Sequence, residues 1–412
     1  MLAERVHVVG AIGSIDLRRP LPGQQGGERF VDQRRVREPR ARASRTRQQR
    51  RVNGGTDSCP WHATTIPQVW HTKACPIIAQ RDATLWWALN PRGSEQKTCL
   101  PNFATISSLR LVLAGKATAM AQHDAQIIAV VGATGLQGGA VTRRLLQEHW
   151  PVRALTRNPE GKKAHALTQL GAEVVKADLS DPVSLEHAFD GVHGVFSMQN
   201  HHLSGYEEEA RQGKQVAEVA KRVGVDQLVY SGAGPGVQGS GVGSWETKLK
   251  VAAHIRTLDL PVTILHPTAF MELMTDPKFF PPASVWHLMP KLMGSTRPVG
   301  WLTVEDLAVI VAKAFGDPDH LMGHEVILAS DVQSIDACRA IWREVTGRPP
   351  RQFPMPRWLF ERFVGTDETT MWRWLGANKV DFDTGPTLAI HPEALTVREW
   401  LERKKAPVGP AN

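Results

Sequence analysis

The chain has 412 residues, of which 42% are hydrophobic, so it is long enough for two or three domains and can bury a large core. Its net charge of +8 would suit a nucleic-acid or anionic-membrane partner. However, residues 1–120 hold 19 basic and 8 acidic residues, whereas residues 121–412 hold 30 basic and 33 acidic ones. Residues 121–412 therefore lack the positive charge that would attract such a partner. No apolar run reaches the length of about 18 residues that a membrane span needs.

The cysteines are also unevenly placed. Cys338 is the only cysteine in residues 121–412, so this part has no disulfide framework and is typical of a reducing compartment. We therefore expect a cytoplasmic protein. Cys59, Cys75 and Cys99 lie 16 and 24 residues apart and form no close CxxC pair, so we expect no metal site.

Residues 1–119 form a basic leader that we expect to be disordered. Residues 34–51 are dense in arginine and offer almost no apolar surface to bury. We favour a misplaced start, with the natural chain beginning at Met120, a few residues before the first predicted strand. Two alternatives stay open: a disordered arm that binds nucleic acid or an acidic partner, and an arginine-rich transit peptide. Nucleic acid is a partner only if the leader is translated.

From residue 126 onward, apolar strands alternate with amphipathic helices. The strands are predicted at residues 127–132, 151–157, 172–178, 192–198, 226–232 and 261–267. The helices are predicted at residues 136–149, 162–171, 182–191, 206–225 and 245–260. This alternation implies parallel strands joined by right-handed crossovers. Because the strands are apolar throughout, we expect an α/β fold whose doubly wound sheet is covered on both faces.

The pattern loosens after Pro267. Residues 276–298 are rich in proline, tryptophan and methionine, a helix is predicted at 304–316, and a strand at 323–330. We therefore divide the chain into the leader 1–119, a nucleotide-binding domain 120–275, and a smaller, mostly helical C-terminal ligand lobe 276–412 that returns some strands to the main sheet. The lobe should lie over the carboxyl ends of the strands, where open α/β sheets bind ligands.

A glycine-rich turn joins the first strand to the first helix. Gly132, Gly135 and Gly138 give the spacing GxxGxxG. One glycine permits the tight turn, another lets the backbone approach a pyrophosphate, and the third lets the helix pack close to the strand. The pyrophosphate would meet the free N–H groups at the positive end of the helix dipole. The turn lies between a strand and a helix of an alternating domain, so it predicts a dinucleotide site in a Rossmann sheet.

The end of the second strand indicates which dinucleotide is bound. An NAD site places an acidic residue about 20 positions further on, bonded to the ribose 2′-hydroxyl. Thr156 occupies that position in this chain, followed by Arg157, with Lys162 and Lys163 close by. Because the planar fork of arginine suits a phosphate, these residues favour NADP(H).

Several segments together resemble one protein family. They are residues 130–141, 155–159, 171–200, 207–232, 246–273 and 303–315. With them the sequence resembles the NmrA-like family of atypical short-chain dehydrogenase/reductases, and within it the HSCARG-like NADPH-sensor subgroup. The resemblance runs from about residue 126 to about residue 328, with a looser match to the C-terminal end, and leaves out the leader.

The resemblance implies a cofactor-binding role for a set of positions that extends from the pyrophosphate to the nicotinamide. They are Gly132, Thr134, Gly135, Leu136, Gln137 and Gly138 at the pyrophosphate; Arg157 and Lys162 at the 2′-phosphate; Asp178 and Leu179 at the adenine; Met198, Gln199 and Asn200 on the path to the nicotinamide; Lys248 at its ribose; and Pro267, Thr268, Ala269 and Phe270 closing over that end.

The catalytic tyrosine of the wider superfamily is missing. That tyrosine lies four residues before a lysine, which lowers the phenol pKa for proton exchange with the substrate. Four residues before Lys248 the chain has Ser244, and its two tyrosines, Tyr206 and Tyr230, lack the spacing. Tyr206 begins a predicted helix and Tyr230 lies in a strand, where we expect it to be packed.

Two histidines are the best substitute proton donors. His201 and His202 follow the fourth predicted strand, and histidine titrates near neutral pH. We favour the simpler interpretation of an exposed loop pair, with His202 and Lys248 as weak catalytic candidates.

Two functions remain open. The first is an NADP(H)-binding redox sensor or regulator that acts on a protein partner, and the second is an NADPH-dependent reductase of a quinone or other small electrophile. The missing tyrosine favours the regulator, whereas the retained Lys248 is compatible with a reductase. A homodimer is also left open.

Overall fold

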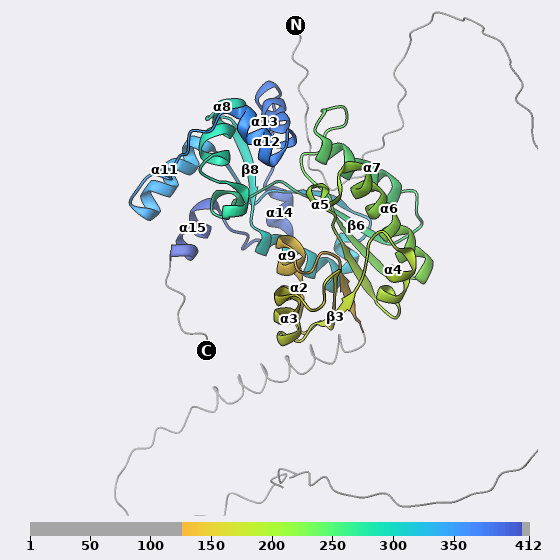
Figure 1. Ribbon diagram of the computed structural model, residues 1–412. Helices are drawn as coiled ribbons and strands as arrows, with labels where there is room; N and C mark the ends of the chain where they lie inside the picture. The colour runs from red at the N-terminus through yellow and green to blue at the C-terminus, as the bar shows by residue number, and fades with distance from the viewer. Residues whose placement is uncertain (1–125, 406–412) are drawn as a thin grey trace, which may run out of the picture. The chain divides into compact units, whose positions relative to one another are not determined.

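The computed structural model describes residues 126–405 (Figure 1). The predicted leader 1–119 and the start at Met120 lie outside the described residues. Within residues 126–405, no helix is long and apolar enough to cross a membrane.

A seven-stranded parallel sheet forms the centre of the fold, in the order β3-β2-β1-β4-β5-β6-β9. Its strands are β1 (Ile128–Val130), β2 (Val152–Thr156), β3 (Glu173–Lys176), β4 (Gly194–Ser197), β5 (Gln227–Ser231), β6 (Val262–Pro267) and β9 (Glu325–Leu328). The order reverses between β1 and β4, which is the switch point where such sheets bind ligands. All six predicted strands are present, and β9 adds a seventh strand beside β6.

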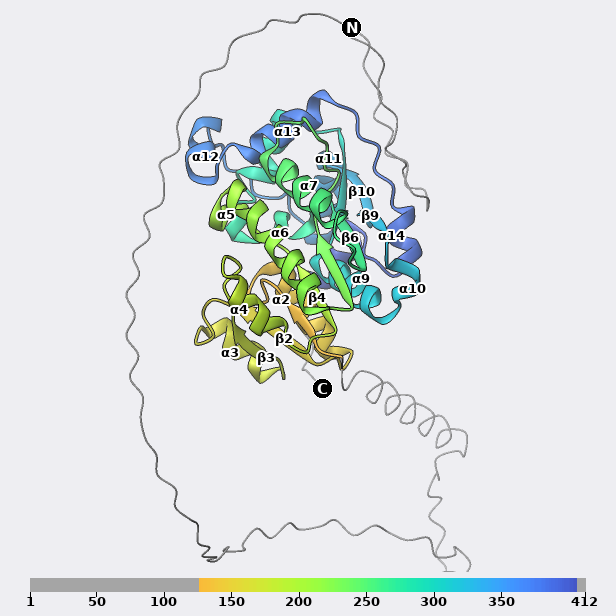
Figure 2. The same ribbon diagram turned by 90° about the vertical axis from the view of Figure 1, so that its right-hand side faces the viewer.

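Helices cover both faces of the sheet, as predicted (Figure 2). One face carries α2 (Leu136–Gln147), α3 (Lys162–Gln169) and α9 (Val304–Gly316), and the other carries α4 (Pro182–Phe189), α6 (Tyr206–Val223) and α7 (Gly243–Ile255). Successive residues of β1 serve the two faces in turn: Ile128 and Val130 pack on the α2 side, Ala129 and Val131 on the α6 side. Because side chains alternate along a strand, both faces need apolar residues, and this explains the unbroken apolar run.

A second, three-stranded sheet has the order β10-β8-β7 and was not predicted. It consists of β7 (Ala269–Phe270), β8 (Pro298–Leu302) and β10 (Asp331–Ser334). The chain leaves the large sheet at Pro267 and enters the small one at Ala269, so residues 267–270 cross between them. Strands this short carry too little alternation for recognition from sequence. The boundary between residues 275 and 276 stays a prediction.

The remaining helices of the described chain lie mostly in the C-terminal part. They are α5 (His201–Ser204), η1 (Met271–Met274), η2 (Pro277–Phe279), the π-helical turn η3 (Ser284–Leu288), α8 (Met289–Met293), α10 (Pro318–Leu321), α11 (Ile335–Thr346), α12 (Arg357–Val364), α13 (Asp367–Ala377), α14 (Gly385–Ile390) and α15 (Val397–Lys405). The loosened stretch 276–298 belongs to a packed core, in which Trp286 lies with Trp301 and Phe360. The mostly helical C-terminal part is therefore confirmed.

Candidate functional site

The glycine turn has the geometry that its sequence predicts. Gly132 has φ +68°, and its carbonyl accepts a hydrogen bond of 2.8 Å from the N–H of Gly135. A methyl group on Gly138 would lie 2.3 Å from the same carbonyl oxygen, so only glycine lets α2 pack this close to β1. No side chain of residues 126–405 caps the N-terminus of α2, whose free N–H groups are a suitable anion site.

Side chains from three neighbouring segments contact this turn. The sulfur of Met198, just after β4, lies 3.0 Å from where a Cβ of Gly132 would stand. Gln137, in the first turn of α2, accepts a hydrogen bond of 2.9 Å from Ser231 at the end of β5. From α3, the Lys163 ammonium donates to the carbonyl of Thr134 at 3.1 Å. The turn is therefore held at the carboxyl ends of β4 and β5.

The other predicted cofactor positions border the same edge of the sheet. Arg157 follows β2 and is exposed, as is Lys162 at the start of α3. Asp178, after β3, accepts a hydrogen bond of 2.9 Å from the N–H of Ser180, so its carboxylate shapes this loop. Leu179 packs against the core on the α6 side. Their assignment to the 2′-phosphate and adenine stays a prediction.

Two further positions lie where the chain crosses between the sheets. Pro267 is buried at the end of β6, and Phe270 is half-buried in β7 against the core on the α2 side. Their contact with a nicotinamide also stays a prediction.

Lys248 is buried on α7 and already has two strong partners. Its ammonium donates to the carbonyl of Gln199 at 2.6 Å and forms an ion pair of 2.9 Å with Glu209 of α6. The Glu209 side chain is 1% exposed. The sequence analysis missed Glu209 because it ends a run of three acids in the first turn of α6, where exposed carboxylates are common.

Ser244 is also engaged. Its hydroxyl donates to the carboxylate of Asp367 at 2.5 Å, and its N–H donates to the same carboxylate at 3.2 Å. Asp367 is buried at the start of α13, more than a hundred residues along the chain. The residue at the tyrosine position therefore fastens α7 to α13.

Tyr206 lies beside Ser244, although its spacing in the sequence gave it no role. Its ring packs so close to Gly243 that a Cβ there would be 2.7 Å from Cζ, and the Asp367 carboxylate lies near enough to act on its phenol. Burial, together with the charge of Asp367, raises the pKa of Tyr206 well above its usual range, so the phenol keeps its proton. Tyr230 is fully buried in β5, as predicted.

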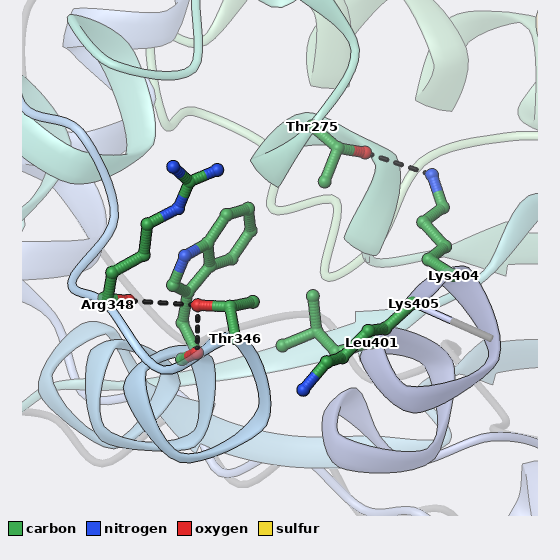
Figure 3. Close-up of a pocket in the computed structure, with 7 residues that line it drawn as sticks. Thr275, Thr346, Arg348, Leu401, Lys404 and Lys405 are labelled. Carbon is green, nitrogen blue, oxygen red and sulfur yellow. Dashed lines mark hydrogen bonds between the residues drawn. The ribbon is translucent and has the colours of Figure 1, made fainter. Parts of the chain in front are cut away.

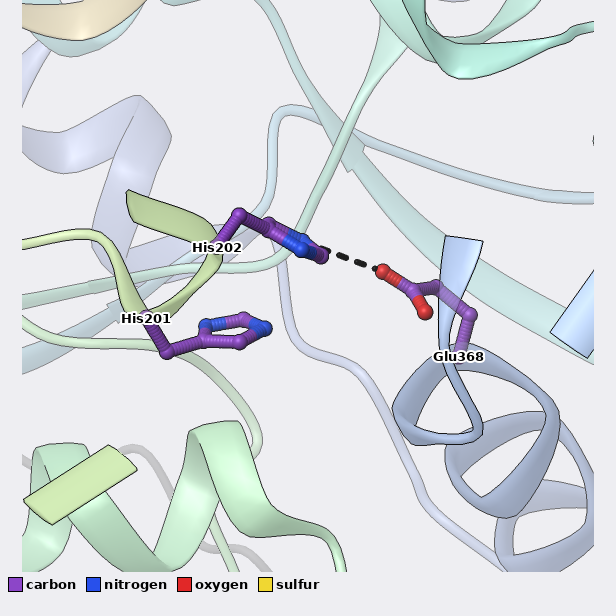
Figure 4. Close-up of side chains that lie close together, drawn as sticks. All are labelled: His201, His202 and Glu368. Carbon is purple, nitrogen blue, oxygen red and sulfur yellow. Dashed lines mark ion pairs between the residues drawn. The ribbon is translucent and has the colours of Figure 1, made fainter. Parts of the chain in front are cut away.

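The expectation of an exposed histidine loop holds for only one of the two residues. The His202 side chain is 47% exposed, but that of His201 is only 15% exposed, and both begin the short helix α5. The His201 ring lies between the rings of His202 and Tyr206, with centroid distances of 4.0 and 4.9 Å. His202 Nε2 lies 3.2 Å from a carboxylate oxygen of Glu368 (Figure 4). Aromatic stacking and this ion pair order the segment.

The two histidines have opposite pKa shifts. Burial, and then the neighbouring His202, lowers the pKa of His201, so its ring is neutral at physiological pH. The hydrogen bond to Glu368 raises the pKa of His202. His202 is thus the better proton donor of the two.

A separate pocket lies in the C-terminal part, between η1, α11 and α15 (Figure 3). Across its mouth the Lys404 ammonium donates to the hydroxyl of Thr275 at 3.0 Å. Its lining residues are Thr275, Trp342, Thr346, Arg348, Leu401, Lys404 and Lys405. None of them belongs to the predicted cofactor positions, so the pocket is distinct from the crevice at the glycine turn.

A turn of this geometry at the switch point of a doubly wound sheet defines the Rossmann class of folds. The chain belongs to the NmrA-like family, whose model matches residues 124–401. The family inferred from the sequence is therefore confirmed.

Three individual relatives share no more than 30% of their residues with this chain over the aligned length. An NmrA-like family domain-containing oxidoreductase, FrzB, from Cladobotryum is 30% identical over 259 residues, which cover 56% of this chain and 77% of FrzB. The solved structure of NmrA, a negative transcriptional regulator, in complex with NADP is 21% identical with a TM-score of 0.55, covering 67% of this chain and 94% of NmrA. The quinone oxidoreductase QOR2 of Escherichia coli, in complex with NADPH, is 20% identical with a TM-score of 0.53, covering 67% and 99%. These structural likenesses show the fold.

Proposed function

We propose that this protein binds NADP(H) and acts as a redox-state sensor or regulator of the HSCARG-like kind. The uncapped N-terminus of α2 and the close approach at Gly138 fit a pyrophosphate. Arg157 and Lys162, with Lys163 beside the turn, would hold a 2′-phosphate. Solved complexes of NmrA with NADP and with NAD, and of QOR2 with NADPH, support a dinucleotide at this turn, so the preference for NADP(H) rests on Arg157 and the two lysines.

The contacts of Lys248 and Ser244 favour a regulator over an enzyme. A lysine that activates a catalytic hydroxyl must lie near it, yet the Lys248 ammonium is held by Glu209 and the Gln199 carbonyl. The hydroxyl of Ser244 is bound to Asp367. Tyr206, the nearest phenol, has a raised pKa, the opposite of the lowering that a catalytic lysine produces. These residues hold the fold together where a catalytic pair would stand.

The same contacts suggest how nucleotide occupancy would be transmitted. Asp367 and Glu368 of α13 contact Ser244, Tyr206 and His202, which lie on α5–α7. Met198 and Gln199 connect these helices to the glycine turn. A nucleotide that favours one arrangement of α13 would shift the population towards it and so alter a surface for a protein partner.

A reductase of quinones or other small electrophiles is the second candidate. The names of FrzB and QOR2 favour it. Hydride transfer to a quinone needs little acid catalysis, so a missing tyrosine does not forbid it. His202, with its raised pKa, would supply the proton.

Nucleotide titration tests the proposal. The full chain should bind NADPH more tightly than NADH, and Arg157→Ala should weaken NADPH binding about 10- to 100-fold, the worth of one charged hydrogen bond. NADH affinity should change little. Arg362→Ala, at an exposed arginine of α12, is the matched control. Equal losses for both nucleotides would contradict the NADP assignment.

Turnover separates the two functions. The regulator should oxidise NADPH slowly or not at all with ketones, aldehydes and quinones. Rapid oxidation with a ketone or alcohol substrate would refute the sensor, whereas oxidation with quinones alone would support the reductase.

A further inference from the structure

Two histidines and a glutamate bring metal-binding atoms together at the contact of α5 with α13. One donor atom from each of His201, His202 and Glu368 lies within 4.8 Å of the other two. Both imidazole rings point towards the Glu368 carboxylate (Figure 4). Among residues 126–405 this is the only such group of three or more histidine, cysteine or acidic side chains.

We propose that His201, His202 and Glu368 bind a divalent transition-metal ion, with Zn²⁺ as the reference ion. Imidazole nitrogen and carboxylate oxygen are ligands that zinc prefers. In a tetrahedral site with bonds of about 2.0–2.2 Å, ligand atoms stand about 3.3–3.6 Å apart. His202 and Glu368, at 3.2 Å, already lie close to this spacing. The remaining pairs lie within 4.8 Å and must close by up to about 1.5 Å when the ion binds.

Two buried polar atoms without hydrogen-bond partners support a metal ion at this site. His201 Nε2 and Glu368 Oε2 are buried and have no hydrogen-bond partner among the described residues. Buried polar atoms are nearly always paired, so each atom needs a partner. The ion pair between His202 and Glu368 leaves both atoms unsatisfied, whereas one metal ion would satisfy them together.

A buried carboxylate, that of Glu209, lies near the second ring nitrogen of His201. Its Oε2 lies 3.9 Å from His201 Nδ1 and has no hydrogen-bond partner in the described part of the chain. Metal-ligating histidines almost always donate their second ring N–H to a carboxylate or carbonyl, which fixes the tautomer. The 3.9 Å separation is too long for a hydrogen bond, so His201 must move by roughly 1 Å as the ion binds for Glu209 to hold its proton on Nδ1 and leave the lone pair of Nε2 to the metal.

Backbone contacts hold the other histidine. The side chain of Asn200 accepts a hydrogen bond of 3.0 Å from the N–H of His202 and fixes the start of α5. Three protein ligands leave the fourth position of a tetrahedral zinc ion open to water or to an oxygen of a small molecule. Because α5 follows the carboxyl end of β4, this open position belongs to the ligand-binding edge of the sheet.

Metal titration of the chelator-treated full chain tests the site without any assay of activity. By calorimetry, the parent should bind one more Zn²⁺ per chain than His202→Gln or Glu368→Gln. Taking this difference also cancels any Zn²⁺ bound by the cysteine thiols, which are the same in all three proteins. Glu209→Gln should keep the stoichiometry and weaken the affinity about 10- to 100-fold, as expected of an outer-shell carboxylate. His320→Gln, at an exposed histidine paired with Asp317, is the matched control and should bind as the parent does.

A spectroscopic variant keeps the test valid if a substitution harms folding. With Co²⁺, His202→Cys should add a thiolate-to-metal charge-transfer band to the spectrum of the parent. Equal Zn²⁺ stoichiometry and affinity in the parent, His202→Gln and Glu368→Gln would overturn the proposal, as would the absence of this band in folded His202→Cys. NADPH binding is measured with chelator present, so failure of the proposed nucleotide function remains distinguishable from failure of the metal site.

Discussion

Replacing Gly138 with alanine tests the close approach of α2 to β1. The new methyl would lie 2.3 Å from the Gly132 oxygen, 2.6 Å from its carbonyl carbon and 2.9 Å from the Val131 oxygen. Ordinary carbon contacts lie near 3.5–4.0 Å, so the helix must move by about 1 Å. All three neighbours are backbone atoms, so no side-chain rotation relieves the clash.

The expected cost has two parts. Overpacking of this kind costs about 1–3 kcal/mol, which lowers Tm by roughly 2–12 °C in a domain of this size. If the turn binds the pyrophosphate as proposed, its displacement would also remove hydrogen bonds to that group. Loss of one charge-assisted bond weakens NADPH binding about 10- to 100-fold.

Thermal unfolding and NADPH titration of Gly138→Ala measure the two parts separately. Gly316→Ala is the control, because its methyl would meet only Trp150, at 3.9 Å, and alanine favours a helix. An unchanged Tm and affinity would refute the packing argument. A lower Tm with full NADPH affinity would show that the turn does not hold the nucleotide.

Two further substitutions test buried carboxylates. Burial, and then the charge of Glu305, raises the pKa of Glu272 to about 7 from 4.5, so the folded state holds this proton more tightly than the unfolded state. The resulting stability is present below about pH 4.5 and is lost as the pH rises through 7. Glu272→Gln should therefore remove a decline of about 2.5 kcal/mol in the free energy of unfolding between pH 5 and 8. Equal pH slopes for the two proteins in urea unfolding would contradict this. Asp367→Asn should destabilise the fold by about 2–3 kcal/mol because it weakens the bonds from Ser244, whereas Asp381→Asn, at an exposed ion pair, should cost less than about 1 kcal/mol. Similar urea midpoints for these two variants would show that the Asp367 contact contributes little.

Much of the large sheet could be predicted because its determinants are local. A strand covered on both faces must be apolar at every position, and Ile128 to Val131 show this directly. The glycine turn is equally local, since Gly132 supplies a positive φ and Gly138 removes a clash six residues away. The small sheet escaped prediction because β7 has two residues and pairs with β8, some thirty positions later.

The sequence by itself therefore determined the alternating α/β pattern, the glycine turn and the absence of a tyrosine four residues before Lys248. Only the tertiary structure decided what surrounds that lysine. Glu209, Tyr206 and Asp367 come from two helices distant in the chain, and their partners depend on how α6, α7 and α13 pack. Short-range patterns report the periodicity of one element, whereas a buried ion pair or a cluster of ligand atoms depends on the relative placement of several elements.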